Sequence, residues 1–143
     1  MRLSTRSRYA ARALGELVRQ GGEDGPVMMR KLAERQNVSK RYLDNIFATL
    51  RLAGLIRTTR GAAGGYMLNQ SPDHTSLLEV VEALDGELSL VECVSEDFEC
   101  ELKGCCATHK VWSEASKALK DSLRKVSLRD LAEMEFQDCP RDD

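Results

Sequence analysis

Aromatic residues are scarce in this sequence, and it has no long apolar run. Its three Phe, three Tyr and one Trp are too few for the stacked rings by which many proteins hold single-stranded nucleic acid. No apolar stretch approaches the roughly 20 residues of a membrane-spanning helix, and the arginines near Met1 are not followed by the apolar core of a signal peptide. We therefore expect a cytoplasmic protein without a membrane partner, built as one domain with or without a dimerising extension.

Cysteine is absent before Cys93 and then occurs as a cluster. Four of the five cysteines and one of the two histidines lie in residues 93–109. An odd number of cysteines in a protein expected to be cytoplasmic argues against a disulfide framework. Thiolate together with imidazole is the ligand chemistry of zinc and of iron–sulfur clusters. The other histidine, His74, lies in a polar turn and is expected to be a solvated surface residue.

The spacing of the clustered cysteines distinguishes between these metals. Six residues separate Cys93 from Cys100, and five separate Cys100 from Cys106. These gaps are wider than the knuckles of structural zinc sites. They favour an iron–sulfur cluster, with zinc binding and thiol chemistry as the alternatives.

Charge divides the chain into two unlike halves. Residues 1–70 hold 13 Lys and Arg against 5 Asp and Glu, a net charge of +8, whereas residues 71–143 hold 8 against 18, a net charge of −10. A basic half joined to an acidic half indicates that the first half meets a polyanion. The alternative is a charged surface that serves only solvation.

The first half has the pattern of a winged helix-turn-helix. Apolar residues recur every three or four positions and predict three helices, over about residues 6–19, 29–36 and 40–53. The last two are joined by a tight turn, which makes a helix-turn-helix unit. Two short strands, 55–59 and 65–68, would form a hairpin around a glycine-rich tip. We therefore predict a mostly α fold with a small two-stranded wing.

Polar residues at the start of the third helix and in the wing have the chemistry to contact duplex DNA. The N-terminal end of the second helix in a helix-turn-helix meets base edges in the major groove. Asn45 can address an adenine, Asp44 can accept from a cytosine amino group, and Arg60 can enter a narrow minor groove. The alternative for the helix residues is that they only keep the surface soluble. The predicted wing directly after this helix favours DNA binding over that alternative. The residues predicted to contact DNA are Lys40, Arg41, Tyr42, Asp44, Asn45, Arg57, Arg60, Gly61 and Gly64.

The second half is predicted to contain helices on both sides of the cysteine cluster. A capping box, Ser76 with Glu79, opens a short helix that ends near Leu84. A long helix over about 107–125 and a short one over 128–134 follow the cluster. A narrow stripe on the long helix predicts pairing in a homodimer; its residues are Val111, Ala115, Ala118, Leu119, Ser122 and Val126. The predicted units are thus a DNA-binding domain (1–85), a cluster-binding loop (86–110), a long dimerisation helix with a short terminal helix (107–135), and a tail (136–143) in which Cys139 is a spare thiol.

Several of these motifs together resemble the IscR and NsrR family of winged-helix iron–sulfur repressors, over nearly the whole chain to about Leu131. The matching segments are Met1–Ser4, Arg8–Ala10, Tyr42–Leu43, Gly54–Ile56, the wing Arg60–Tyr66 and the Cys…Cys…Cys-x2-His loop. The resemblance implies a dimeric transcription regulator without enzymatic activity or a small-molecule substrate. It further implies that Cys93, Cys100, Cys106 and His109 hold the cluster, that Arg60 enters the minor groove, and that Asp44 tunes the preferred DNA site.

The loop departs from the family pattern in two ways. The first gap has six residues where the family has five, and Cys105 offers a rival to Cys106. Cys106 and His109 share a helix face if the first turn is helical, and Cys105 would then point about 100° away and be a bystander. The histidine resembles that of the IscR branch of the family, and this resemblance implies a 2Fe–2S cluster, with 4Fe–4S as the alternative. A regulator that uses zinc or cysteine oxidation is the second functional hypothesis, and an electron-transfer protein, which would need neither wing nor basic half, is a distant third.

Overall fold

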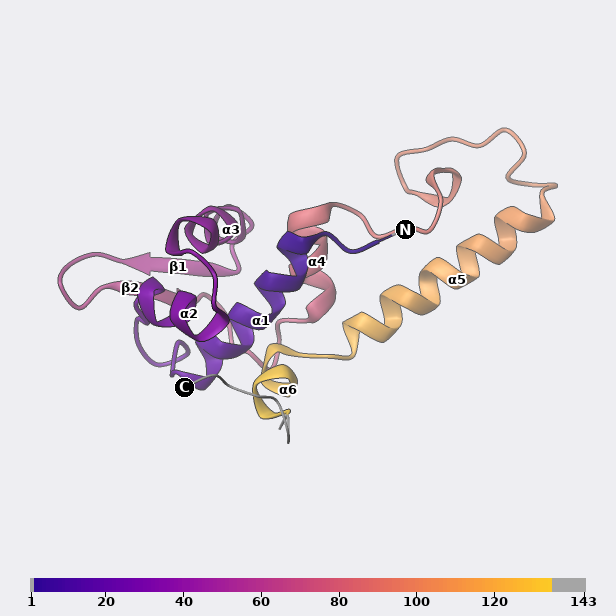
Figure 1. Cartoon of the computed structure of the whole chain (residues 1–143). Helices are drawn as coiled ribbons and strands as arrows, with labels where there is room; N and C mark the ends of the chain where they lie inside the picture. The colour runs from indigo at the N-terminus through magenta and orange to yellow at the C-terminus, as the bar shows by residue number, and fades with distance from the viewer. Residues whose placement is uncertain (1, 135–143) are drawn as a thin grey trace.

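The computed structural model describes residues 2–134. Figure 1 shows a helical body with the wing projecting from one end and the long helix α5 running away from the body toward the opposite end. The described helices and strands are, in order, α1 (Thr5–Arg19), α2 (Met29–Gln36), α3 (Lys40–Leu52), β1 (Ile56–Thr59), β2 (Gly65–Leu68), α4 (Leu77–Asp85), the short 3-10 helix η1 (Glu92–Val94), α5 (Ala107–Arg124) and α6 (Leu128–Glu133). The predicted mostly α fold with a two-stranded wing is confirmed. No helix within this part of the chain is both long and apolar enough to cross a membrane.

Helix α1 lies at the centre of the main core. Ser4 caps it by accepting a hydrogen bond from the amide of Ser7, and the predicted apolar stripe of the helix is buried. The same core includes residues from α2, α3, both strands, α4 and α6. The core residues with no exposed surface are Ala10, Ala13, Leu14, Leu17, Leu32, Leu43, Ile46, Phe47, Leu50, Val80 and Leu128.

The turn between α2 and α3 has the predicted geometry. Asn37 ends α2 in the left-handed conformation, with φ 53° and ψ 46°, which asparagine tolerates better than most residues. Ser39 then caps α3 by accepting from the amide of Tyr42 at 3.1 Å. This turn directs the N-terminal end of α3 outward.

The wing is a regular antiparallel hairpin. Ile56 pairs with Leu68 and Thr59 with Gly65, so the tip comprises residues 60–64. Val27, in the segment between α1 and α2, also pairs with Tyr66 of β2, through two backbone hydrogen bonds of 2.9 Å. Strand β2 therefore pairs with β1 on one edge and with Val27 of the helical body on the other.

Helix α5 packs on the body only through its C-terminal half. Leu119 and Leu123 contact a small apolar cluster made by Leu78, Val81 and Leu88. Leu119, one of the predicted seam residues, is thus partly covered by α4 of its own chain, and its place in a dimer seam stays a prediction. The predicted seam residues Val111, Ala118 and Ser122 remain exposed. Cys139 and the rest of the predicted tail lie outside the described residues.

Helix α6 returns to cover α1. Leu128 is fully buried, and Leu131 lies over Gly15, where an added Cβ would be 3.7 Å from the Cβ of Leu131. The guanidinium of Arg19 donates to the carbonyl oxygens of Leu131 and Ala132, both at 2.9 Å. These bonds satisfy carbonyls at the end of α6 that its own turns leave unpaired.

Glu16 is a buried charge that joins α1 to α2. Its carboxylate accepts from Gln20 at 2.9 Å, Arg19 at 3.2 Å and Arg35 of α2 at 3.3 Å. Burial acts to raise its pKa, but the hydrogen bonds from Gln20 and Arg19 and the charge of Arg35 outweigh burial, so its pKa lies below the ordinary 4.5. The ionised form is therefore the one that the fold stabilises.

We expect Glu16→Gln to lower the free energy of unfolding by about 1–2 kcal/mol at neutral pH, because charge-assisted hydrogen bonds are lost. The stabilisation from the lowered pKa is complete above the unfolded value near 4.5 and is lost as pH falls through the lower folded value. In urea unfolding, the difference from wild type should thus stay constant from about pH 7 to 5 and shrink at more acidic pH. Glu34→Gln is the matched control, because Glu34 pairs with Arg30 at an exposed site and should change stability little. Equal losses in both variants would contradict a special role for Glu16.

Candidate nucleic-acid interface and cysteine loop

The N-terminal end of α3 and the wing are the exposed parts of the basic half that were predicted to contact DNA. Lys40, Arg41 and Asn45 are exposed on α3, and Arg57 and Arg60 are exposed on the wing. Among residues 2–134, the guanidinium groups of Arg41, Arg57 and Arg60 form no ion pair with a carboxylate. These cations are therefore available to an external anion.

Two of the predicted contact residues are partly tied into the fold. Tyr42 is half-buried, and its ring meets that of Tyr9 edge to face with centroids 5.7 Å apart. The carboxylate of Asp44 accepts from Lys40 at 2.7 Å and from the hydroxyl of Tyr66 at 3.1 Å. Tyr66 belongs to the wing and was not among the predicted site residues. Its link to α3 depends on the register of β2, which no local sequence signal reveals.

The glycines of the wing tip are needed by the hairpin itself. Gly61 has φ +110°, a conformation that side chains rarely adopt, and a Cβ on Gly64 would be 2.2 Å from the carbonyl oxygen of Thr59. Turn geometry therefore accounts for both residues. Their contact with DNA remains a prediction.

The segment predicted to bind the cluster, residues 86–110, is called the cysteine loop below. It lies at the N-terminal end of α5, opposite the wing (Figure 1). Cys93 is in η1 and half-buried, Cys100 is half-buried in an irregular segment, and Cys105 is exposed just before α5. Cys106 is the N-cap of α5 and His109 is in its first turn, where it is buried. Cys106 therefore precedes the helix that was expected to hold it, so the 100° argument does not fix the direction of Cys105.

The inner face of α5 holds the loop through polar contacts. His109 and Ser116, seven residues apart on this face, are the buried residues of the helix. The hydroxyl of Ser116 accepts from the amide of Leu90 at 3.0 Å. Lys120 donates to Glu87 at 3.2 Å, and Glu87 also accepts from the amide of Glu96. Ser116 was not among the predicted site residues, because its partner, the amide of Leu90, is 26 residues away in the chain.

His109 is oriented by the backbone of Cys93. The ring Nε2 is 3.0 Å from the carbonyl oxygen of Cys93. Because a carbonyl oxygen only accepts, Nε2 carries the proton, and the lone pair of the neutral ring is on Nδ1. Histidines that bind metals are commonly held in this way, with one ring N–H donated to a backbone carbonyl.

Cys106 has the environment of a reactive or ligating thiol. Its sulfur is 3.2 Å from the hydroxyl of Thr108. This contact, followed by the amide of His109, lowers the pKa of Cys106 below the ordinary value for a thiol. The thiolate is the form that binds metals, and a lowered pKa favours that form at Cys106.

The donor types of the loop fit an iron–sulfur cluster, but the donors are not gathered around one point. Within the described part of the chain, no three His, Cys, Asp or Glu side chains converge as they would around a metal ion. The structure brings the Cys93 backbone to His109 and places Cys106 three residues before it in the chain. Joining all four predicted ligands at one point would therefore require the loop to change its conformation.

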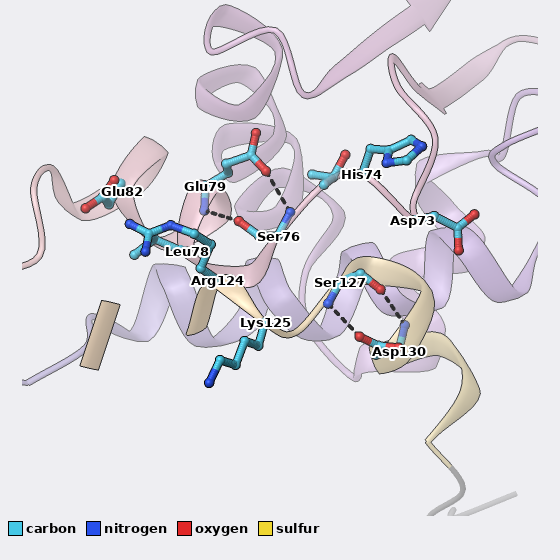
Figure 2. Close-up of a pocket in the computed structure, with 11 residues that line it drawn as sticks. Asp73, His74, Ser76, Leu78, Glu79, Glu82, Arg124, Lys125, Ser127 and Asp130 are labelled. Carbon is cyan, nitrogen blue, oxygen red and sulfur yellow. Dashed lines mark hydrogen bonds between the residues drawn. The ribbon is translucent and has the colours of Figure 1, made fainter. Parts of the chain in front are cut away.

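Helix α5 is connected to the body at a junction with α4 and α6 (Figure 2). The amide of Leu77 donates to Val126 at 2.8 Å, and the amide of Leu128 donates to Thr75 at 2.9 Å. Figure 2 shows the capping boxes of α4 and α6 beside this pairing, each with a serine and a carboxylate bonded to the other's backbone amide. An open pocket lies at the same place. This junction is where the direction of α5 is set.

Comparison with known proteins places the chain among transcription regulators. The Rrf2 family model, described as "Iron-dependent Transcriptional regulator", matches residues 3–134. Protein rrf2 of Nitratidesulfovibrio vulgaris is 39% identical over 131 residues, which cover 92% of this chain and 87% of that protein.

Solved structures agree with this family. CymR of B. subtilis, described as the global cysteine regulator, has a TM-score of 0.76 at 35% identity and covers 92% of this chain and 96% of its own. T. potens IscR has a TM-score of 0.70 at 31% identity and covers 96% of this chain and 94% of its own. The predicted resemblance to IscR-type regulators is confirmed. The chain belongs to the Rrf2 family of transcriptional regulators and has the winged-helix fold of its relatives.

Proposed function

We propose that this protein is a homodimeric repressor whose affinity for a DNA operator is controlled by an iron–sulfur cluster bound in the cysteine loop. The observation that carries the cluster proposal is the hydrogen bond from His109 Nε2 to the carbonyl of Cys93. In the neutral ring this bond leaves the lone pair of Nδ1 for a metal, within a loop whose four cysteines include the other three proposed ligands. The ligands in this proposal are Cys93, Cys100, Cys106 and His109, with a 2Fe–2S cluster favoured over 4Fe–4S.

The DNA-binding part of the proposal is supported by family membership and by the exposed cations. The exposed N-terminal end of α3 would enter the major groove, and Arg60 would enter the minor groove beside it. Lys40, Arg41, Asn45 and Arg57 supply further polar or cationic contacts on the same half of the molecule. Phosphate contacts of this kind account for most of the affinity, and base contacts provide the specificity.

The dimer would form along the exposed face of α5. Val111, Ala115, Ala118 and Ser122 follow one another at intervals of four, three and four residues, which is the spacing of a coiled-coil seam. Val111 is 54% exposed and the neighbouring Trp112 is 42% exposed. Pairing of two α5 helices would bury these apolar side chains and set the spacing of the two DNA-reading heads.

A regulator that senses through thiol oxidation is the second candidate. The observation that favours it is the exposed Cys105 beside Cys106. In this alternative the same loop would change its conformation through oxidation of its cysteines. Zinc in the loop is a further variant of the same idea.

Protein purified without air should be red-brown and contain iron and inorganic sulfide in the ratio of a cluster. We expect Cys93→Ala, Cys100→Ala and Cys106→Ala each to abolish the visible absorption, because each removes a proposed ligand. His109→Ala should leave a labile cluster, and His109→Cys a sturdier one of lower potential, because imidazole ligation raises the potential.

Cys105→Ala is the matched control and should retain the cluster. Circular dichroism and sedimentation should show that all these variants remain folded dimers. If Cys105→Ala loses the colour while Cys106→Ala keeps it, the assignment of the third cysteine is wrong. Colourless wild-type protein that binds zinc, and stays colourless after reconstitution, would favour the second candidate.

Arg60→Ala should weaken specific DNA binding by about 1–3 kcal/mol, because a cation in the minor groove would be lost. Log affinity of the wild type should fall steeply with log salt, since several cations displace counterions from the duplex. The duplex for these titrations would be selected from a randomised library with wild-type protein. Lys117→Ala, which removes an exposed cation from α5, should bind like wild type. Native affinity in Arg60→Ala would remove the wing from the interface.

A further inference from the structure

We infer that Tyr66 is a positioning residue for sequence recognition, which holds the Asp44 carboxylate in one orientation so that Asp44 discriminates between bases. This inference rests on the proposed DNA-binding function. It assigns Tyr66, on the wing, a role in the specificity of α3.

Both oxygens of the Asp44 carboxylate are held in place. Oδ1 accepts from the Tyr66 hydroxyl at 3.1 Å, and Oδ2 accepts from Lys40 Nζ at 2.7 Å. Asp44 is half-buried between them, at the DNA-facing end of α3. Lys40 is a weak restraint, because its ammonium is exposed and can move to a phosphate. Tyr66 is the firm restraint.

Tyr66 is itself fixed by three independent contacts. Its backbone exchanges two hydrogen bonds of 2.9 Å with Val27, and it pairs with Thr58 across the hairpin. Its ring meets Phe47 edge to face, with centroids 5.1 Å apart and planes at 89°, and Phe47 has no exposed surface. Burial, followed by the hydrogen bond and charge of Asp44, raises the pKa of Tyr66. The phenol therefore stays protonated and remains a donor.

A fixed carboxylate is more selective than a mobile one. A carboxylate can accept from the amino group of cytosine, but the edges of guanine and thymine in the major groove present acceptors to it. A mobile side chain could rotate away from such a mismatch and reduce its cost. Tyr66 restrains this rotation. When a base places an acceptor opposite Asp44, the carboxylate therefore stays there without a donor, and the energetic cost of the mismatch remains.

The competing explanation is that Tyr66 only stabilises the fold. Tyr66→Phe separates the two explanations, because it keeps the ring on Phe47 and removes only the hydroxyl that contacts Asp44. A structural effect would persist when Asp44 is absent. An effect on positioning would disappear, because no carboxylate would remain to be held.

The experiment compares the base preferences of four full-length proteins: wild type, Tyr66→Phe, Asp44→Ala and the double variant. Each is incubated with a library of randomised 30-base-pair duplexes, and the bound fraction is sequenced. Positions whose preference disappears in Asp44→Ala are those that Asp44 reads. At these positions we expect Tyr66→Phe to lower the ratio of preferred to disfavoured bases about tenfold, the fold-change equivalent to one hydrogen bond to a charged group.

Three further results complete the test. The double variant should match Asp44→Ala, and the affinity of Tyr66→Phe for non-specific duplex should equal that of wild type. Tyr9→Phe, which removes another phenol hydroxyl from the same half of the chain, should keep the wild-type preferences. Thermal unfolding followed by circular dichroism would verify that each variant is folded.

Several outcomes would overturn the inference. Wild-type preferences in Tyr66→Phe would show that the hydroxyl does not matter, and a further loss in the double variant would show that Tyr66 acts without Asp44. If Asp44→Ala keeps every preference, Asp44 reads no base and Tyr66 has nothing to position. Enrichment of no motif by wild type would reject the proposed DNA-reading function, and this inference with it.

Discussion

The enclosure of helix α1 determines where the other elements lie. One side of α1 packs on α2, α3 and the base of the wing, and α6 covers another side through Leu131 over Gly15. Arg19 and Glu16 join these two sides, because Arg19 binds the end of α6 and contacts Glu16, which binds Arg35 of α2. A helix buried in this way cannot tilt without breaking contacts with both the DNA-reading half and the C-terminal half.

The return of α6 to α1 dictates the course of α5. Because α6 follows α5 after only three residues, the C-terminal end of α5 must lie against the body. Its N-terminal end is then placed far away, since a helix of 18 residues is about 27 Å long. The cysteine loop therefore lies remote from the wing, and within one chain α5 and α4 are the elements that connect them.

The parts of the fold that follow from local sequence patterns were predictable. The contacts between elements that are distant in the sequence were not. The apolar stripe of α1, the Ser39 cap and the Ser76 capping box each depend on residues close together in the sequence, and they occur as expected. Periodicity gave the apolar residues of α5 but not their partners, so the contact of Leu119 with the α4 cluster was not predicted. Glu16 and Tyr66 gave no signal, because their partners lie on other elements. The ligand types in the loop were readable from composition, whereas the contact between His109 and the backbone of Cys93 required coordinates.

Cys93 combines two roles, which gives the loop a means of affecting α5. Its carbonyl orients His109 on the inner face of α5, and its thiol is one of the proposed ligands. Any ligand that draws the thiol of Cys93 to a new position also changes the position of the carbonyl that holds the imidazole.

The adjoining contacts of the loop with Ser116 and Lys120 lie further along the same helix face, beside the Leu119 and Leu123 contacts with α4. Because the C-terminal end of α4 is bonded through Asp85 to Ser4, the cap of α1, the loop and the enclosed helix share one continuous set of contacts. Binding in the loop can alter DNA affinity only if two arrangements of this set differ in their affinity for the operator.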